Sequence, residues 1–202
     1  MRAPRLVAVV AALAAALLLG GCVEINTGSG DDTGTTDHNA ADVSFAQDMI
    51  PHHQQALVMA DGAIEGAQTP ELRALAERIK AAQAPEIDQM TSWLEAWGED
   101  VPDLDAMSHM MMGHGDDDEL NDMPGMMDAD QMQRMTQMMG GGRALDEMWV
   151  RMMILHHEGA IEMAQEEQSS GQYPDAITLA EDIESAQTAE IAEMKEMLRD
   201  WR

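Results

Sequence analysis

Two pairs of adjacent histidines, His52-His53 and His156-His157, are the residues of this sequence best suited to chemistry. A neutral imidazole binds copper, zinc, iron or nickel through a ring nitrogen. Methionines lie close to both pairs, and their thioether sulfur is a soft ligand that prefers Cu(I) to hard cations. A His and Met set without cysteine therefore favours copper, Cu(I) in particular, over zinc, although another transition metal also fits the histidines.

The histidine pairs occupy equivalent positions in an internal repeat. When the chain is shifted by 104 residues, residues 42–98 align with residues 146–202 without a gap, and 21 of 57 positions are identical. Such a repeat indicates one structural unit present twice, in which each copy helps to bury the apolar face of the other.

Each repeat predicts two helices joined as a hairpin. Residues 45–63 and 149–163 place apolar residues and one histidine at alternating steps of four and three, which is one stripe of a helix. A second helix follows Thr69-Pro70, with Thr69 as its cap and Pro70 in its first turn. Because two hairpins can bury each other's stripes, we predict an all-α, ferritin-like four-helix bundle built from two repeated helical hairpins.

The hairpin geometry also predicts which side chains face each other. An apex near residues 67–68 places His52 opposite Gln83 and Met49 opposite Glu86. The equivalent pairs in the second repeat are His156 with Gln187 and Met153 with Glu190. The second histidine of each pair points about 100° away from the first, toward a neighbouring helix. Each repeat would therefore gather two imidazoles, a carboxylate, an amide and several thioethers at one level.

The predicted bundle site combines the histidines with methionines and with two glutamates that act as ligands or orient the imidazoles. Its candidate residues are His52, His53, His156, His157, Met49, Met59, Met90, Met153, Met163, Met194, Glu86 and Glu190. Imidazole binds a metal only when neutral, so binding by the histidines should fade as the pH falls through about 6.5.

Two other functions fit the same residues. One is a structural or interaction lipoprotein whose core holds a His-Glu-Gln network without metal. The other is a metal-dependent redox enzyme. Enzymatic activity is less favoured, because di-iron bundles use a Glu-x-x-His motif and neither Glu86 nor Glu190 begins one.

The segment between the repeats, residues 99–145, is rich in methionine. Eleven of the 21 methionines lie within residues 107–139. Candidate ligands for additional Cu(I) in this segment are His109, Met110, Met111, Met112 and His114. Asp128 can cap a short helix that runs to Met139 and ends at the following glycines. The segment could instead serve as an apolar lid over the bundle.

The amino terminus has the features of a bacterial lipoprotein signal. A short basic start and a run of Leu, Val and Ala precede Gly20-Gly21-Cys22, and the run is too short to span a bilayer comfortably. We therefore expect a signal peptide over residues 1–21, lipidation of Cys22, a flexible tether over residues 22–40 and a bundle domain over residues 41–202. The protein would be exported and held at a membrane of the cell envelope, and the sequence leaves open which membrane.

The charge of the chain restricts its partners. Without the two basic residues of the expected signal, nine basic residues stand against 38 acidic ones, a net charge of −29. Nucleic acid is not expected as a partner, because phosphate backbones require Lys and Arg. Metal ions are attracted to such a surface, and the sequence leaves protein partners open.

The sequence around both histidine pairs resembles the family called domain of unknown function 305. The resemblance rests on residues 49–56 and 153–161, on the residue pairs Asp42/Asp146 and Met59/Met163, and on residues 123–127, and it extends over about residues 41–202. Family members are similar to ferritin-like bundles, and some are associated with copper binding in the bacterial envelope. The resemblance implies a ligand role for His52, His53, His156, His157 and nearby methionines, whereas it implies no agreed enzymatic activity. Leu155 departs from the Pro51 of the first repeat, so the two helix starts are expected to differ.

Overall fold

The computed structural model describes residues 37–103, 123–138 and 141–202, and these residues form helices without any strand. The helices are α1 (Ala40–Gly66), α2 (Pro70–Trp97), α5 (Ala129–Met138), α6 (Arg143–Ser170) and α7 (Pro174–Asp200). The prediction of an all-α bundle is confirmed. None of the helices in the described ranges is long and apolar enough to cross a membrane.

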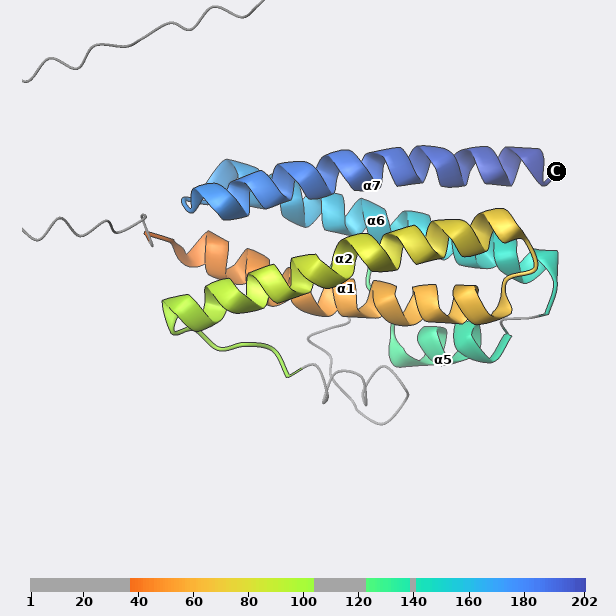
Figure 1. The fold of residues 1–202 in the computed structure, drawn as a ribbon, viewed down its shortest axis with the longest axis horizontal. Coiled ribbons are helices and arrows are strands. Elements are labelled where there is room, and N and C mark those ends of the chain that lie inside the picture. Colours follow the sequence, from red (N-terminus) through yellow and green to blue (C-terminus); the bar gives the residue numbers. More distant parts are fainter. Residues whose placement is uncertain (1–36, 104–122, 139–140) are drawn as a thin grey trace, which may run out of the picture. The chain divides into compact units, whose positions relative to one another are not determined.

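The four long helices form two hairpins, α1 with α2 and α6 with α7, which meet where α1 packs against α6 (Figure 1). The helix boundaries of the second hairpin match those of the first, shifted by 104 residues, to within one residue. The shorter α5 contacts α1.

Local signals at the helix starts explain these boundaries. Asn39 caps α1 in a capping box with Asp42, whose carboxylate accepts from the Asn39 backbone N–H at 2.6 Å. Pro70 stands in the first turn of α2 as expected. Thr69 is the N-cap residue of α2 as expected, but its hydroxyl donates to Asp146 of the other hairpin and not to the backbone of α2. Pro51 lies inside α1 and not at its start.

Two equivalent carboxylates tie each hairpin to the apex of the other. Asp42 accepts from the backbone N–H groups of Gln172 and Tyr173 at 3.0 and 2.8 Å. Asp146 accepts from the backbone N–H groups of Gln68 and Thr69 at 3.0 and 2.9 Å. Both contacts give partners to backbone donors at a hairpin apex and link the two hairpins to each other.

The hydrophobic core consists of two clusters. The first joins the end of α1, the start of α2, the start of α6 and the end of α7, with Met127, Met132 and Met135 beside it. The second joins the opposite halves of the same four helices, from Phe45 to Ile183. Residues 34–202 form one compact unit that contains every member of both clusters, so this part of the chain carries its own core.

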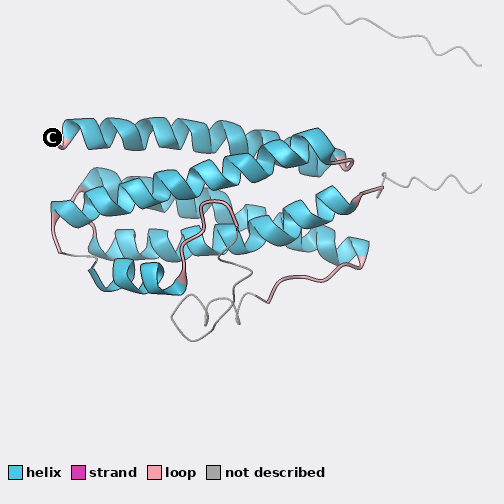
Figure 2. Ribbon diagram, turned by 180° about the vertical axis from the view of Figure 1, so that it is seen from behind, coloured by secondary structure: helices cyan, strands magenta, loops and turns pink. Residues whose placement is uncertain are grey.

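The residues before α5 run as a loop across the bundle (Figure 2). Asp128 accepts from the backbone N–H of Gln131 at 2.7 Å, which supports the predicted capping of α5. Buried methionines anchor α5 to the first cluster, so the part of the linker from residue 123 onward covers the bundle.

Candidate metal centre

A layer of polar side chains separates the two hydrophobic clusters. Its members are His52, His53, Gln83, Glu86, His156, His157, Gln187 and Glu190. All four histidines are at most 1% exposed, although burying a polar group costs free energy unless it finds a partner. Hydrophobic packing alone therefore does not explain why four histidines are buried in this layer.

Two histidines of the layer hydrogen-bond to glutamates of their own hairpin. His53 Nε2 lies 2.7 Å from Glu86 Oε2, and His157 Nε2 lies 2.7 Å from Glu190 Oε2. A carboxylate oxygen accepts, so Nε2 carries a proton and donates, and in a neutral imidazole this leaves the lone pair on Nδ1. These contacts are the arrangement in which a carboxylate orients a metal-binding imidazole.

The first histidines of the two pairs meet each other instead. His52 and His156 have ring centroids 3.8 Å apart and an interplanar angle of 38°. His52 Nε2 lies 3.1 Å from the backbone oxygen of Pro124, so it donates to that carbonyl and its lone pair is also on Nδ1.

The hydrogen bonds across each hairpin come from the second histidine of each pair and not from the first. Glu86 and Glu190 face the second histidine of each pair, and the carbonyl oxygens of the Gln83 and Gln187 amides have no hydrogen-bond partner. The level of each residue was estimated for one hairpin at a time, whereas His52 and His156 contact each other across the two hairpins.

Five ring nitrogens of the layer are buried without a hydrogen-bond partner. They are Nδ1 of His52, His53 and His157, and both Nδ1 and Nε2 of His156. Leaving such a group unpaired costs about 1–3 kcal/mol. In a neutral ring one nitrogen carries a proton, so His156 offers one lone pair and each of the other three histidines offers that of Nδ1. A metal ion bound through these lone pairs would remove their part of the cost, so the residues present fit such an ion.

The protonation state of His52 and His156 also suits metal binding. Burial lowers the pKa of His52 to about 3, with an added effect of the neighbouring His53 and His157 that exceeds the opposing hydrogen bond to Pro124. Burial and the neighbouring His52 also hold the pKa of His156 well below its ordinary value. Both rings are neutral at physiological pH, and His52 stays neutral far below the pH of 6.5 expected from the sequence.

The candidate methionines differ in their distance from this layer. Met49 and Met90 are buried in the second cluster, and Met153 and Met194 in the first, each about one helical turn from a histidine or glutamate of the layer. Met59 and Met163 follow the histidine pairs by nearly two turns. Met59 packs among apolar residues of the first cluster, and Met163 packs against the second.

The loop before α5 closes one side of the layer, and sequence reasoning missed the residues that hold it. Gln55 binds the Met127 backbone with two hydrogen bonds of 2.8 Å, one to its N–H and one to its carbonyl. The Pro124 carbonyl packs directly against Gly159, and a Cβ on this residue would overlap with the carbonyl. Gln55 and Gly159 occupy equivalent positions of the two repeats. The difference in residue type between these positions is the feature of the sequence that could have indicated their role.

A surface pocket of about 570 Å³ adjoins this loop. Met126 and Met152 line it, together with Glu158 and Glu162. Gly159, which is three residues from His156 along α6, lines the same pocket, so soft sulfur ligands are present on the surface near the layer.

Several predicted residues lie outside the described part of the chain, namely Cys22, His109, Met110, Met111, Met112 and His114. Within the described ranges, no three side chains of the types His, Cys, Asp and Glu are already arranged around a common metal position. A complete ligand set at the layer would therefore include thioethers or require small side-chain movements.

The structure thus belongs to a class of all-α proteins in which two repeated hairpins enclose a layer of histidines. Residues 42–198 match the family described as Domain of unknown function (DUF305), and the chain belongs to this family. No curated protein matches the sequence significantly.

Solved structures share this fold. CopM in its Cu(I)-bound form has a TM-score of 0.61 and 32% identity, over 79% of this chain and 96% of CopM. Its Cu(II)-bound form has a TM-score of 0.63 and 33% identity, over 80% and 97%. A DUF305 protein from Streptomyces coelicolor has a TM-score of 0.65 and 28% identity, over 80% and 93%. CopM has also been solved with bound silver.

Proposed function

We propose that this protein binds copper, Cu(I) preferentially, outside the cytoplasm and thereby sequesters or buffers it. The observation that carries the proposal is the buried layer of four histidines with unpaired ring nitrogens. Copper binding by the similar protein CopM supports the choice of metal.

The roles of the layer residues follow from their hydrogen bonds. Nδ1 of His52, His53 and His157 holds a free lone pair and would bind the ion. Glu86 and Glu190 accept from the opposite ring nitrogen, so they would orient the imidazoles and raise their basicity.

Thioethers would complete the ligand set and select Cu(I). Met49, Met90, Met153 and Met194 are the candidates one turn from the layer, and Met59 and Met163 would need a larger change to reach it. Sulfur ligands hold Cu(I) well and hard cations poorly, and they remain usable where thiols would oxidise.

The methionine-rich segment would bind further Cu(I). We assign this role to His109, Met110, Met111, Met112 and His114 on the basis of their composition. Met126 and Met152, which line the surface pocket beside the loop over the layer, would supply further sulfur ligands.

Lipid anchoring through Cys22 would keep the protein at a membrane of the envelope. The support for this part is the sequence alone, in which the single cysteine follows an apolar run and two glycines. Buffering at that location needs no catalytic group, so we propose binding and not redox catalysis as the function.

A Cu(I) competition titration tests the proposal. It compares the wild type, a variant with all four layer histidines replaced by Ala, and a variant with His109, Met110, Met111, Met112 and His114 replaced by Ala, which leaves the loop over the layer and α5 intact. Each change should remove a different part of the bound copper, because the two ligand groups are separate in the sequence. Equal uptake by all three proteins would refute the assignment, and no uptake by the wild type would favour a structural His-Glu network.

A further inference from the structure

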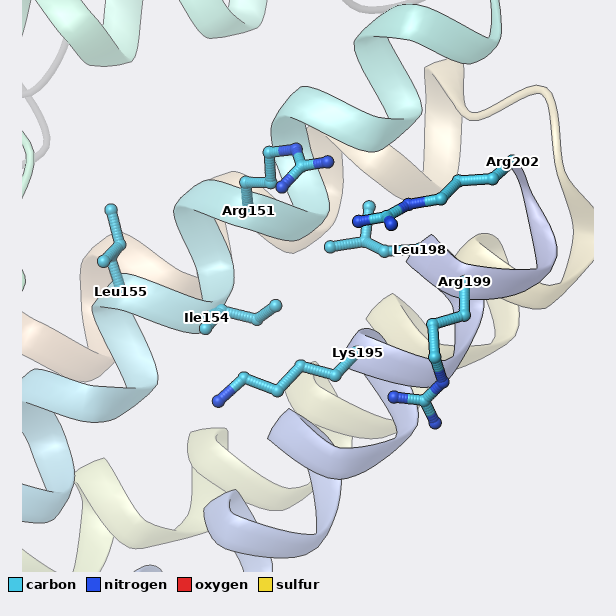
Figure 3. Close-up of a pocket in the computed structure, with 7 residues that line it drawn as sticks. All are labelled: Arg151, Ile154, Leu155, Lys195, Leu198, Arg199 and Arg202. Atoms are coloured by element: carbon cyan, nitrogen blue, oxygen red, sulfur yellow. The ribbon is translucent and has the colours of Figure 1, made fainter.

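A cationic groove lies between α6 and the end of α7 (Figure 3). Its volume is about 470 Å³, which is the size of a pocket for a small ligand. Ile154, Leu155 and Leu198 form its apolar part, and Leu155 is 61% exposed. Its other lining residues are Arg151, Lys195, Arg199 and Arg202, and no acidic side chain lines it.

The positive charge is unusual for this chain. The protein has 11 basic and 38 acidic residues, yet four of the basic residues surround one groove. In Figure 3 the guanidinium groups of Arg151 and Arg202 point toward each other across Leu198. Two like charges that face each other over an apolar surface repel, and a bound anion would relieve that repulsion.

Carboxylates neutralise these cations poorly. Lys195 lies 3.4 Å from Glu158, and Arg199 lies 3.9 Å from Glu196. Arg151 and Arg202 form no side-chain ion pair or hydrogen bond within the described ranges. Elsewhere on the bundle, by contrast, Arg78 contacts both carboxylate oxygens of Glu193 at 2.6 and 2.7 Å.

The repeat supplies an internal comparison. The apolar residues Ile154 and Leu198 match Ile50 and Leu94 of the first repeat. The cations Arg151, Lys195, Arg199 and Arg202 match Gln47, Thr91, Glu95 and Gly98. The same helical framework therefore forms without any of the four cations, so folding does not account for their presence.

We propose that this groove binds the anionic headgroup of a membrane phospholipid. Arginine side chains form paired hydrogen bonds with phosphate, and Arg151 and Arg202 are placed to do so from two sides. Leu155 and Leu198 give the glycerol and the first acyl carbons an apolar surface.

The apolar part of the groove favours a lipid over other anions. A free phosphate has no apolar part that could contact an exposed leucine. An acidic protein partner would need a contact surface broader than a groove of this volume. An exposed apolar side chain among Lys and Arg is the combination found where proteins touch anionic membranes. The bundle would then lie with α6 and α7 toward the lipid.

The test uses residues 34–202, which carry the complete core and lack Cys22, so that binding does not depend on an anchor. The probe is dihexanoyl phosphatidylglycerol below its micelle-forming concentration, titrated by calorimetry. Dihexanoyl phosphatidylcholine and glycerol 3-phosphate are the matched probes, because one lacks net charge and the other lacks acyl chains. We expect phosphatidylglycerol to bind more tightly than both.

The variant Arg151→Gln/Lys195→Thr introduces the residues of the first repeat at two cationic positions. It should weaken phosphatidylglycerol binding by roughly 25-fold, from about fivefold for each of the two cations. The control, Arg78→Gln/Lys80→Gln on α2, changes the charge equally and should bind as the wild type does. Leu155→Ser, an exposed change, should also weaken lipid binding without altering the unfolding temperature.

Four results would overturn the proposal. They are equal binding of phosphatidylcholine, equal binding of glycerol 3-phosphate, unchanged binding by Arg151→Gln/Lys195→Thr, and displacement of the lipid by a low concentration of polyglutamate. Equal binding of glycerol 3-phosphate would indicate a free anion as the ligand, and displacement by polyglutamate would indicate an acidic protein.

Discussion

His52 and His156 are 104 residues apart in the sequence, yet their rings lie with centroids 3.8 Å apart at the contact between α1 and α6. This contact brings the histidine pairs of both repeats into one layer instead of leaving one site in each hairpin. The copper site that we propose would therefore take its ligands from both hairpins.

Replacing the glutamates of the layer should weaken copper binding without unfolding the bundle. Glu86→Gln/Glu190→Gln keeps the shape of both side chains but removes the charged acceptors of His53 and His157. Loss of such an orienting carboxylate typically costs 10–100-fold in metal affinity. Competition with a Cu(I) chelator measures the effect, and the exposed change Glu77→Gln should leave the affinity unaltered. Equal affinities for both variants would show that the glutamates do not act through the histidines.

Gly159→Ala should displace the loop that covers the layer. A Cβ at this position would overlap with the Pro124 carbonyl, which is the acceptor of the His52 hydrogen bond. We expect the free energy of unfolding to fall by about 1–3 kcal/mol, as in other overpacked sites. Urea denaturation measures it. Gly62→Ala on α1 is the control and should not destabilise, because Ala favours helix and the second repeat has the exposed Glu166 there. Unchanged stability in Gly159→Ala would mean that the loop does not pack as described.

Much of this arrangement could be predicted from the sequence. The offset of 104 residues and the helical stripes were enough to predict an all-α bundle with the four histidines inside. They were insufficient for the layer itself, because the position of His52 depends on how two hairpins dock and a stripe describes one helix at a time. The partners Pro124, Gln55 and Gly159 were missed for the same reason, since they depend on the path of the segment between the repeats.

Glu167 should make the bundle less stable as the pH rises. Burial raises the pKa of Glu167 to about 8, and the adjacent Asp42 carboxylate adds to the effect. The folded chain then retains a proton that the unfolded chain releases above about pH 4.5. The stabilising contribution of this proton is complete below that pH and is lost as the pH rises to about 8.

Glu167→Gln tests this pH dependence, because Gln cannot ionise. The variant should match the wild type near pH 5 and exceed its free energy of unfolding at pH 9, as measured by urea titrations across that range. A constant difference between the two proteins at every pH would argue against a raised pKa.

Cys22→Ala should release the protein from membranes. The expected lipid on Cys22 provides several acyl chains, which together anchor a protein firmly. Fractionation of cells that express each form measures the membrane-bound share. If the variant remained in the membrane fraction to the same extent as the wild type, the anchor would not be at Cys22.

The most direct test of the copper site is nitrogen NMR of the histidine rings during titration with Cu(I). We predict that His53 and His157 hold their proton on Nε2 throughout, since each donates to a glutamate. Their Nδ1 signals, with that of His52, should shift on metal binding, because these atoms carry the free lone pairs. Copper bound with all of these Nδ1 signals unchanged would contradict a metal site in the histidine layer.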